Sequence, residues 1–341
     1  MDAHLAESLL TLAEQAGPAL RGLDSKAAFD QLDERYGDLQ LAMRWFIEQG
    51  RADEALRMAS ALVVFWMATK RLDAAAAWFD RVLTLTGGDA AHRGRALFDA
   101  GYLAFWKGND ERSASLQNQA IEIGRRTKDP TVSALALVGL ARIALRTNVD
   151  EARKLCREAV AVTEGTADRI GRSSAMHVLA VAAQMAGDLL EARDLMSQRI
   201  AIGRETGNFA TISSEAGNLS MVERQLGNLD RAEALGREAL EIDCRRGDDM
   251  SVPWKVNGLA AVAAERGEFS RAATLIGVAD ATMEAAGGAW PPDEWQQYER
   301  TVKIVTDAMG SPEFDRARAA GRAMTTADGI ACTLGKGSDT Q

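Results

Sequence analysis

The sequence predicts an all-α fold of stacked helical pairs, an α-solenoid, on three observations. A six-residue turn phrase recurs at residues 108–113, 147–152, 187–192, 227–232 and 267–272, in steps of 39 or 40 residues. Repetition at a period of about 20 to 50 residues is typical of stacked repeat proteins. The chain is rich in Ala, Leu, Arg and Glu but has only six Pro and three Tyr, which suits helices. No run alternates between apolar and polar residues, so we expect no sheet.

The turn phrase contains residue types that end one helix and begin the next. A Gly such as Gly227 can adopt the left-handed conformation that a Cβ disfavours, which ends the first helix. The Asn, Asp or Glu that follows can accept hydrogen bonds from the free N–H groups of the second helix. An Ala five residues after the Gly, as at Ala232, allows two helices to cross closely. Since one pair cannot bury its apolar face alone, neighbouring pairs must stack into a continuous core.

Four regions follow along the chain. Residues 1–89 are expected to form an N-terminal helical cap with irregular repeats, in which a first helix over residues 2–20 is broken at Gly17–Pro18 and at Arg21–Gly22. Residues 90–288 hold five regular repeats of about 40 residues. Residues 289–334 form a C-terminal helical cap, and residues 335–341 a disordered tail.

Each regular repeat is predicted to contain two helices, and Asp129 with Pro130 gives the clearest helix start. The first helices are expected at residues 90–107, 130–146, 168–186, 208–226 and 250–266. The second helices are expected at residues 110–126, 149–163, 189–205, 229–245 and 269–286.

The repeat resembles the tetratricopeptide repeat in its turn and in two small-residue positions. Gly101 and Ala180 lie seven positions before the turn, and an Ala lies twelve positions after the Gly, with Arg199 as a departure. The period is nearer 40 than about 34, and most units lack the usual Pro between helices. These departures resemble the repeats at the C-terminal end of MalT-like, LuxR-type bacterial transcriptional regulators. The resemblance implies a right-handed superhelix whose concave groove is lined by the first helix of each pair.

Both ends of the chain carry a related resemblance. Residues 32–45 are similar to the segment that begins the helical repeats in signalling ATPases of the nucleotide-binding regulator type. Residues 271–277, 291–292, 298–300 and 320–322, with Phe314 and Met324, resemble the C-terminal cap of the same regulators. The ATPase and winged-helix domains of those regulators are absent from this sequence. These are packing motifs, which indicate architecture more than activity.

Charge and motifs narrow the function classes. The net charge of −9 disfavours direct nucleic-acid binding, although a local basic patch remains compatible with it. The start has no leader pattern and no apolar window could span a membrane, so we expect a cytoplasmic protein with three reduced thiols. No phosphate-binding, metal or nucleophile motif occurs, and residues 329–337 have the wrong Gly spacing for a phosphate loop. We therefore expect no cofactor and no metal.

The candidate binding site is the groove side of the first helices. Its side chains are aromatic or apolar with a few polar groups, which suits a small organic effector, a peptide or a protein. We select Arg95, Phe98, Tyr102, Trp106, His177, Gln184, Met221, Arg224, Trp254 and Asn257. Packing alone could also explain parts of this set. The aromatic residues from Phe98 to Trp106 have core spacing, His177 suits a structural hydrogen bond, and Trp254 could cap its helix.

Three functions remain open. The leading hypothesis is a non-catalytic binding or scaffold module, the effector- or protein-sensing repeat region of a bacterial regulator. The alternative is a stand-alone protein that binds a small molecule in the groove for sequestration, resistance or biosynthesis. A third hypothesis is an enzyme that uses Tyr102, His177 and Glu265. Self-association is left open.

Overall fold

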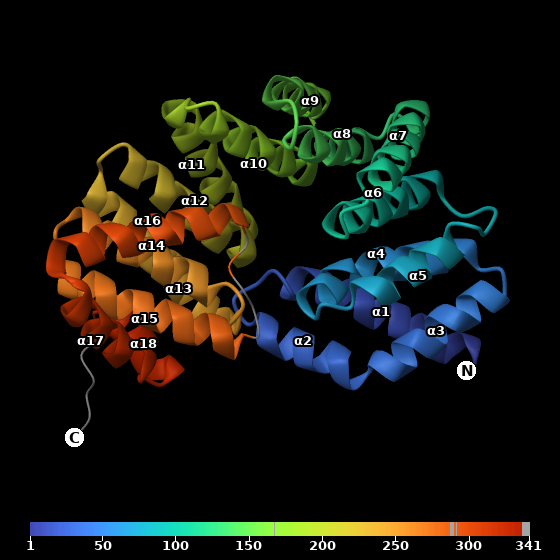
Figure 1. Cartoon of the computed structure of the whole chain (residues 1–341). Coiled ribbons are helices and arrows are strands. Elements are labelled where there is room, and N and C mark those ends of the chain that lie inside the picture. Colours follow the sequence, from blue (N-terminus) through green and yellow to red (C-terminus); the bar gives the residue numbers. More distant parts are fainter. Residues whose placement is uncertain (167, 287–289, 291, 336–341) are drawn as a thin grey trace. The chain divides into compact units, whose positions relative to one another are not determined.

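The computed structural model describes residues 1–166, 168–286, 290 and 292–335 (Figure 1). These residues form helices and no strand, so the all-α prediction is confirmed. Contacts divide the chain into unit 1 (Met1–Ile202) and unit 2 (Gly203–Gln341), with the division inside α11. Each unit is described by itself. The predicted four-region division remains a prediction, and residues 336–341 of the predicted tail lie outside the described residues.

The helices of unit 1 are α1 (Ala3–Ala19), α2 (Ser25–Glu34), α3 (Tyr36–Glu48), α4 (Ala52–Ala68), α5 (Leu72–Val82), α6 (Ala90–Trp106), α7 (Asp110–Thr127), α8 (Pro130–Ala144), α9 (Val149–Val162), α10 (Arg169–Met185) and most of α11 (Leu189–Thr206). Those of unit 2 are α12 (Phe209–Gln225), α13 (Leu229–Arg246), α14 (Val252–Glu265), α15 (Phe269–Ala285), α16 (Pro292–Met309), α17 (Ser311–Arg322) and α18 (Thr326–Thr333). Every predicted boundary from α6 to α15 lies within two residues of the observed one.

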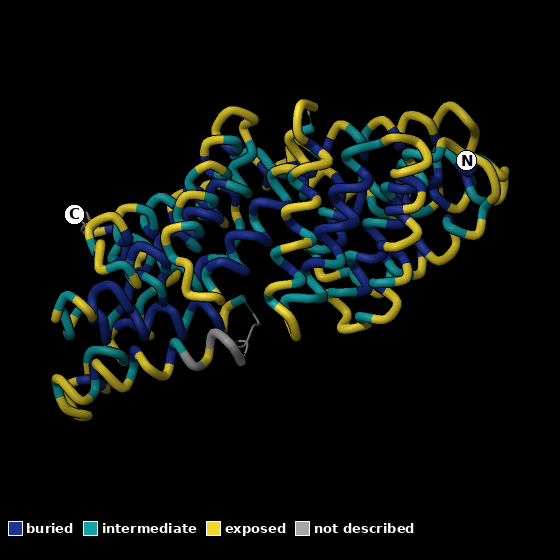
Figure 2. The backbone as a smooth tube through the Cα atoms, turned by 90° about the horizontal axis from the view of Figure 1, so that it is seen from above, coloured by how far each residue is buried: buried dark blue, intermediate teal, exposed yellow. Residues whose placement is uncertain are grey.

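Consecutive helices pack against each other in both units. In unit 1, α6 packs on α7, α7 on α8 and α8 on α9. The second helix of one pair, α7, therefore also contacts the first helix of the next pair, α8. In unit 2, α12 packs on α13 and α14 on α15, and α17 then packs along α15. Figure 2 shows the result as buried inner helix faces with exposed turns and outer faces. This is the local packing that repeated helical pairs require.

The repeat turns have the predicted glycine geometry. Gly108, Gly187, Gly227 and Gly267 have φ between 76° and 83°, in the left-handed region. The small crossing positions are also confirmed, because the Ala five residues after each of the last three glycines is fully buried. A larger side chain at these crossings would separate the paired helices.

Capping follows the prediction at some turns only. The side chain of Asn109 accepts a hydrogen bond from the backbone N–H of Arg112 at 3.0 Å. At the most typical turn the prediction is wrong, since Asn228 makes no side-chain cap bond. Its amide instead donates to Oε2 of Glu223 at 2.7 Å, and Glu223 is fully buried. A buried carboxylate needs hydrogen-bond donors more than an exposed helix start needs an acceptor.

The first helix has nearly the predicted extent of residues 2–20, but Gly17 and Pro18 do not break it. Helix α1 continues through Pro18 to Ala19, and the N–H of Leu20 still donates to the carbonyl of Ala16 at 2.8 Å. Pro18 lies in the last turn, where its missing N–H removes one intrahelical bond at an end that is already incomplete.

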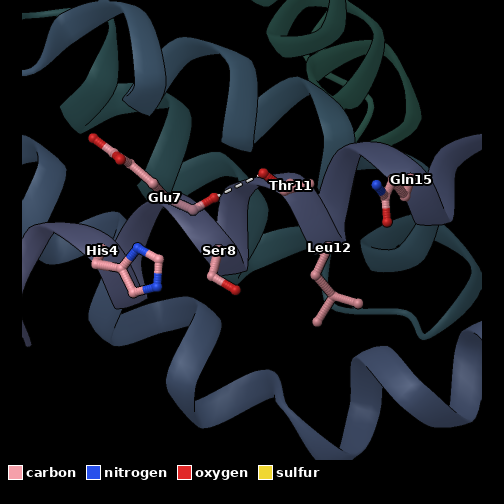
Figure 3. Close-up of a pocket in the computed structure, with 6 residues that line it drawn as sticks. All are labelled: His4, Glu7, Ser8, Thr11, Leu12 and Gln15. Atoms are coloured by element: carbon pink, nitrogen blue, oxygen red, sulfur yellow. Dashed lines mark hydrogen bonds between the residues drawn. The ribbon is translucent and has the colours of Figure 1, made fainter.

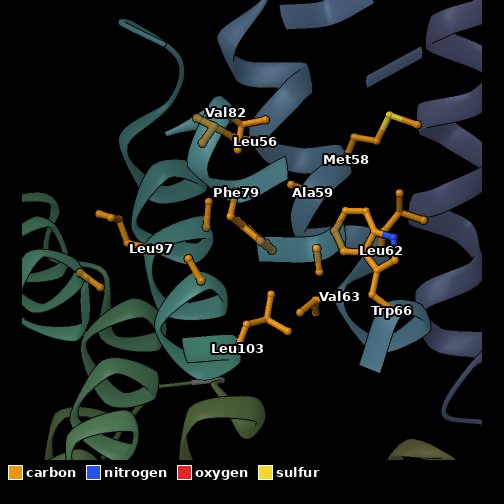
Figure 4. Packing of buried hydrophobic residues seen from close by; sticks show 14 of the residues in the cluster. Leu56, Met58, Ala59, Leu62, Val63, Trp66, Phe79, Val82, Leu97 and Leu103 are labelled. Atoms are coloured by element: carbon orange, nitrogen blue, oxygen red, sulfur yellow. The ribbon is translucent and has the colours of Figure 1, made fainter. Parts of the chain in front are cut away.

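Large aromatic side chains fill the core between the N-terminal helices of unit 1. Trp66 and Phe79 are buried and their rings meet edge to face at 6.2 Å. Figure 4 shows these two side chains between α4, α5 and α6, with Leu62 and Leu103 beside them. The indole N–H of Trp66 donates to the hydroxyl of Tyr36 at 3.2 Å, so the large ring is buried without an unsatisfied donor.

The C-terminal helices of unit 2 cross very closely. A Cβ on Gly277 of α15 would lie 2.0 Å from the carbonyl oxygen of Arg318, and one on Gly321 of α17 would lie 2.0 Å from that of Thr274. Both glycines belong to the segments that resemble a C-terminal cap. They bring two backbones together at a distance that no other residue type permits.

Candidate functional site

The ten predicted groove residues all lie on the first helices of their pairs. In unit 1, α6 carries Arg95, Phe98, Tyr102 and Trp106, and α10 carries His177 and Gln184. In unit 2, α12 carries Met221 and Arg224, and α14 carries Trp254 and Asn257. The assignment of these ten residues to a ligand remains a prediction, but the surroundings of several are now defined.

A row of aromatic side chains runs along α6. The rings of Phe98 and Tyr102 stack with centroids 6.0 Å apart, and Trp106 meets Tyr102 edge to face at 6.1 Å. Residues four positions apart lie on one face of a helix, which is why the three rings touch. The row is graded in burial: Phe98 and Tyr102 are half-buried, whereas Trp106 is 53% exposed. Its far end therefore presents a large apolar ring to solvent.

Guanidinium groups lie over the same aromatic row. Arg142 of α8 lies over the ring of Tyr102, 5.3 Å from its centroid, and Arg146 lies over Phe105 at 4.2 Å. Arg146 also forms an ion pair with Asp110 at 2.6 Å. Arg142, in contrast, has no carboxylate within 4 Å among the described residues. We call the surface formed by Tyr102, Trp106 and Arg142 the α6–α8 surface.

The buried end of the row has further positive charge. Arg95 lies over Phe98 at 5.8 Å and donates through Nε to Asp99 at 2.8 Å. The Asp99 carboxylate raises the pKa of Arg95. Burial, with the neighbouring charge of Arg95, lowers the pKa of Arg21, which follows α1. Only Arg95 bonds to Asp99, and Arg21 instead donates to the carbonyl oxygen of Gly17, so these three ionisable groups together carry a net positive charge although the chain is acidic overall.

Sequence reasoning missed Arg21 and Arg142. Arg142 follows Tyr102 by 40 residues, one repeat period, so periodicity could have identified it as the neighbouring residue. Arg21 lies outside the regular repeats, and no sequence pattern relates it to α6.

The predicted residues of unit 2 have different surroundings. Trp254, in the first turn of α14, meets Trp290 edge to face at 5.8 Å. Trp290 in turn stacks on Tyr298 at 5.3 Å. Arg224 is ion-paired with Glu265, and Asn257 is only 2% exposed. Trp254 is thus part of an aromatic cluster of the C-terminal cap, which the sequence did not indicate.

A buried polar cluster joins α12, α13 and α14. Asp243 is 2% exposed and accepts a hydrogen bond from the hydroxyl of Ser213, while Nζ of Lys255 lies 3.9 Å from its Oδ2. Lys255 lies across Gly217, where a Cβ would come within 2.7 Å of Nζ. Burial raises the pKa of Asp243 to about 6, and the attraction of Lys255 only partly opposes this. Arg246 and Asp248 also act on this carboxyl, in opposite directions.

Asp243 should make stability depend on pH between about 4 and about 6. In this window the folded chain keeps a proton that the unfolded chain releases, so this contribution to stability falls as pH rises and is constant above it. We expect the free energy of unfolding of the wild type minus that of Asp243→Asn to fall by about 2 kcal/mol from pH 4 to pH 6.5. Urea denaturation of both proteins at each pH measures it. Groups with a lowered pKa, such as Glu233, contribute equally in both proteins, so their effect cancels in the difference. A difference that stays level or rises with pH would contradict the expectation.

The remaining surface features are weaker candidates for a binding site. A depression beside α1 is lined by His4, Glu7, Ser8, Thr11, Leu12 and Gln15, all from that one helix (Figure 3). It is therefore the open side of a single helix. Among the described residues, no group of three or more His, Cys, Asp or Glu side chains is placed to hold a metal ion. In the same part of the chain, no helix has the length and apolarity needed to cross a bilayer.

The residues of the enzyme hypothesis are not brought together within either unit. Tyr102 and His177 belong to unit 1, on α6 and α10. Glu265 belongs to unit 2, where it is ion-paired with Arg224.

The helical pairs, each joined by a glycine turn and packed on the next, define the class of helical-repeat proteins. Within that class, residues 216–246 match the tetratricopeptide repeat family, a range that covers the second half of α12 and the whole of α13. No curated protein matches the sequence.

Solved structures extend the fold comparison to nearly the whole chain. A Rap protein complexed with competence and sporulation factor is 11% identical with a TM-score of 0.54, over 93% of this chain and 100% of that one. The apo form of the quorum sensor NprR from B. thuringiensis is 12% identical with a TM-score of 0.52, over 91% and 85%. A signal transduction ATPase with a tetratricopeptide-repeat sensor from Pyrococcus horikoshii is 9% identical with a TM-score of 0.55, over 87% and 45%. These similarities confirm the predicted tetratricopeptide-like α-solenoid class.

Proposed function

We propose that this chain is a non-catalytic binding module that recognises a peptide or protein segment on the α6–α8 surface. The observation that carries the proposal is Arg142, which lies over Tyr102 beside the exposed ring of Trp106 and has no carboxylate partner in the described part of the chain. Trp, Tyr and Arg are the residue types that most often dominate binding energy in interfaces. An exposed indole next to such a guanidinium suits an apolar or aromatic side chain that is followed by an acidic group.

The structural similarities are compatible with a sensing role. One similar structure is a Rap protein in complex with competence and sporulation factor, one is a quorum sensor, and one carries a repeat described as a sensor. We therefore propose, as the narrower context, the effector- or protein-sensing repeat region of a cytoplasmic bacterial regulator related to the MalT-like group. The predicted groove residues of unit 1, on α6 and α10, are the wider surface over which such a partner would extend.

Selection from a randomised peptide library on the purified chain tests the proposal. We expect enriched peptides to combine Asp or Glu with aromatic or apolar residues and to bind more weakly as salt rises. Trp106→Ala and Arg142→Gln should each raise the dissociation constant at least about tenfold, or 1.4 kcal/mol, because both residues contact the ligand directly.

Two exposed residues of unit 2 serve as matched controls. Trp295→Ala and Arg316→Gln remove the same side-chain types from α16 and α17 and should leave the dissociation constant unchanged. Equal affinity of the Trp106 and Arg142 variants and the wild type would disprove the assigned surface. A stoichiometric organic molecule that is retained from cell extract and lost in Trp106→Ala would instead favour the small-molecule alternative.

A further inference from the structure

A second surface of unit 1 has an open cavity of about 170 Å³. It lies between α9, α10 and α11, and its walls are the apolar side chains of Val160, Met176, Leu179 and Leu195. Met176 and Leu179 form its buried part, with exposed fractions of 3% and 6%. The cavity is therefore a small apolar space that opens to solvent.

Gln198 and two arginines complete the lining of this cavity, and among the described residues only Arg157 of the two is ion-paired, at a long distance. Nη2 of Arg157 lies 3.8 Å from Glu191, whose other carboxylate oxygen is already hydrogen-bonded by Arg153. Arg172 is exposed and has no carboxylate within 4 Å among the described residues. The side chain of Arg157 is 58% exposed. An apolar space beside two such guanidiniums favours an apolar group that carries a negative charge.

The size of the cavity restricts the apolar group. Pockets for drug-sized molecules measure about 300 to 1,000 Å³, whereas an engineered apolar cavity of about 150 Å³ accepts benzene. The present space of about 170 Å³ therefore holds one large side chain, and any further part of a ligand must lie outside it. In a polypeptide, an apolar side chain and a carboxylate on the same Cα atom occur only at the C-terminal residue.

We propose that this cavity binds the C-terminal residue of a partner polypeptide, with an apolar side chain in the cavity and its free carboxylate between Arg157 and Arg172. The site is separate from the α6–α8 surface. On α10, the residues of the cavity lie roughly 120° around the helix axis from His177 and Gln184. Binding here is thus independent of the function proposed above.

Two small probes that differ only in charge test the proposal. N-acetyl-leucine carries the free carboxylate, and N-acetyl-leucinamide replaces it by a neutral amide. Methyl NMR of Met176, assigned by its loss in Met176→Leu, reports occupation of the cavity directly. We expect N-acetyl-leucine to shift this signal saturably with a millimolar dissociation constant, and the amide to bind at least about fivefold more weakly.

Variants of the two arginines test whether their charges cause the preference for the acid. Arg157→Gln combined with Arg172→Gln should remove the difference between the two probes. Arg126→Gln, on the exposed surface of α7, should preserve it. Both arginines of the cavity are exposed, so we expect the double variant to fold. Unchanged NMR signals of the other methionines will show that it does.

Four results would overturn the proposal. They are no shift of Met176 with either probe, equal shifts with acid and amide, a charge preference that survives the double variant, and tighter binding of hexanoate than of N-acetyl-leucine. The last result would identify a free amphiphilic carboxylate as the ligand in place of a chain terminus.

Discussion

Gly277→Ala is expected to destabilise the C-terminal part of unit 2 by about 3 kcal/mol or more. The new Cβ would lie 2.0 Å from the carbonyl oxygen of Arg318 and 2.9 Å from the backbone nitrogen of Arg322. These are backbone atoms of α17, so no side-chain rotation can relieve the overlap. The two helices must separate, which also weakens the buried contact of Phe314 with the core of unit 2.

Gly258→Ala is the matched control for this substitution. Gly258 lies inside α14, and a Cβ there would meet nothing within 4 Å. Alanine has the higher helix propensity, so this variant should gain about 0.5–1 kcal/mol. Urea denaturation gives both differences, and amide hydrogen exchange should accelerate in α15 and α17 of Gly277→Ala only. If both alanine variants were equally stable, the close crossing of α15 and α17 would be wrong.

Asp280→Ala should cost about 2–3 kcal/mol, because it leaves Tyr298 and Arg318 without the carboxylate to which they donate. Asp280 is 7% exposed and accepts hydrogen bonds from the hydroxyl of Tyr298 and from Nε of Arg318, both at 2.8 Å. Arg322 approaches the same carboxylate to 3.5 Å. Removing one partner of a buried ion pair costs about 3–5 kcal/mol. We expect the smaller loss of about 2–3 kcal/mol because the side chain of Arg318 is 34% exposed, and water can partly replace the lost carboxylate.

Glu284→Ala tests whether the cost of Asp280→Ala arises from the burial of that carboxylate. Glu284 lies one helical turn beyond Asp280 on α15 and pairs with Arg322 at 2.6 Å, but its side chain is 66% exposed. An exposed ion pair of this kind contributes about 0–1 kcal/mol, so Glu284→Ala should have little effect. Tyr298→Phe, which removes one hydroxyl from the network, should cost about 1 kcal/mol. Thermal denaturation orders the three variants, and a loss for Asp280→Ala no greater than that for Glu284→Ala would refute the account.

Local sequence determined the helices and their turns. Helix ends depend on nearby residues, and a positive φ at Gly227 or an Asp129–Pro130 start needs no distant partner. The all-α class followed from repetition of these local signals. The contact of Phe98, Tyr102 and Trp106 could also be predicted, because four-residue spacing places them on one face of α6.

The errors arose where tertiary contacts compete with local preference. Asn228 has the residue type of a helix cap, but its amide bonds to the buried Glu223. Pro18 has the residue type of a helix breaker, but α1 continues past it while packed on α3 and α4. At Asn228 a buried neighbour outweighs a capping preference of about 1 kcal/mol, and at Pro18 the position in the last helical turn keeps the cost of proline low.

Only the tertiary structure decided which charges remain without a partner and where an open cavity lies. In the sequence Arg142 and Arg172 look like any other arginine, and only the structure shows that no carboxylate of the described residues lies near either of them. The cavity between α9, α10 and α11 depends on how three helices fit together, which helical periodicity alone does not specify. The same holds for Gly277 and Gly321: their positions mark a helix crossing only when the two backbones are seen side by side. Helices and turns depend on residues that are neighbours in the sequence, whereas a binding site consists of residues that become neighbours only when the chain folds.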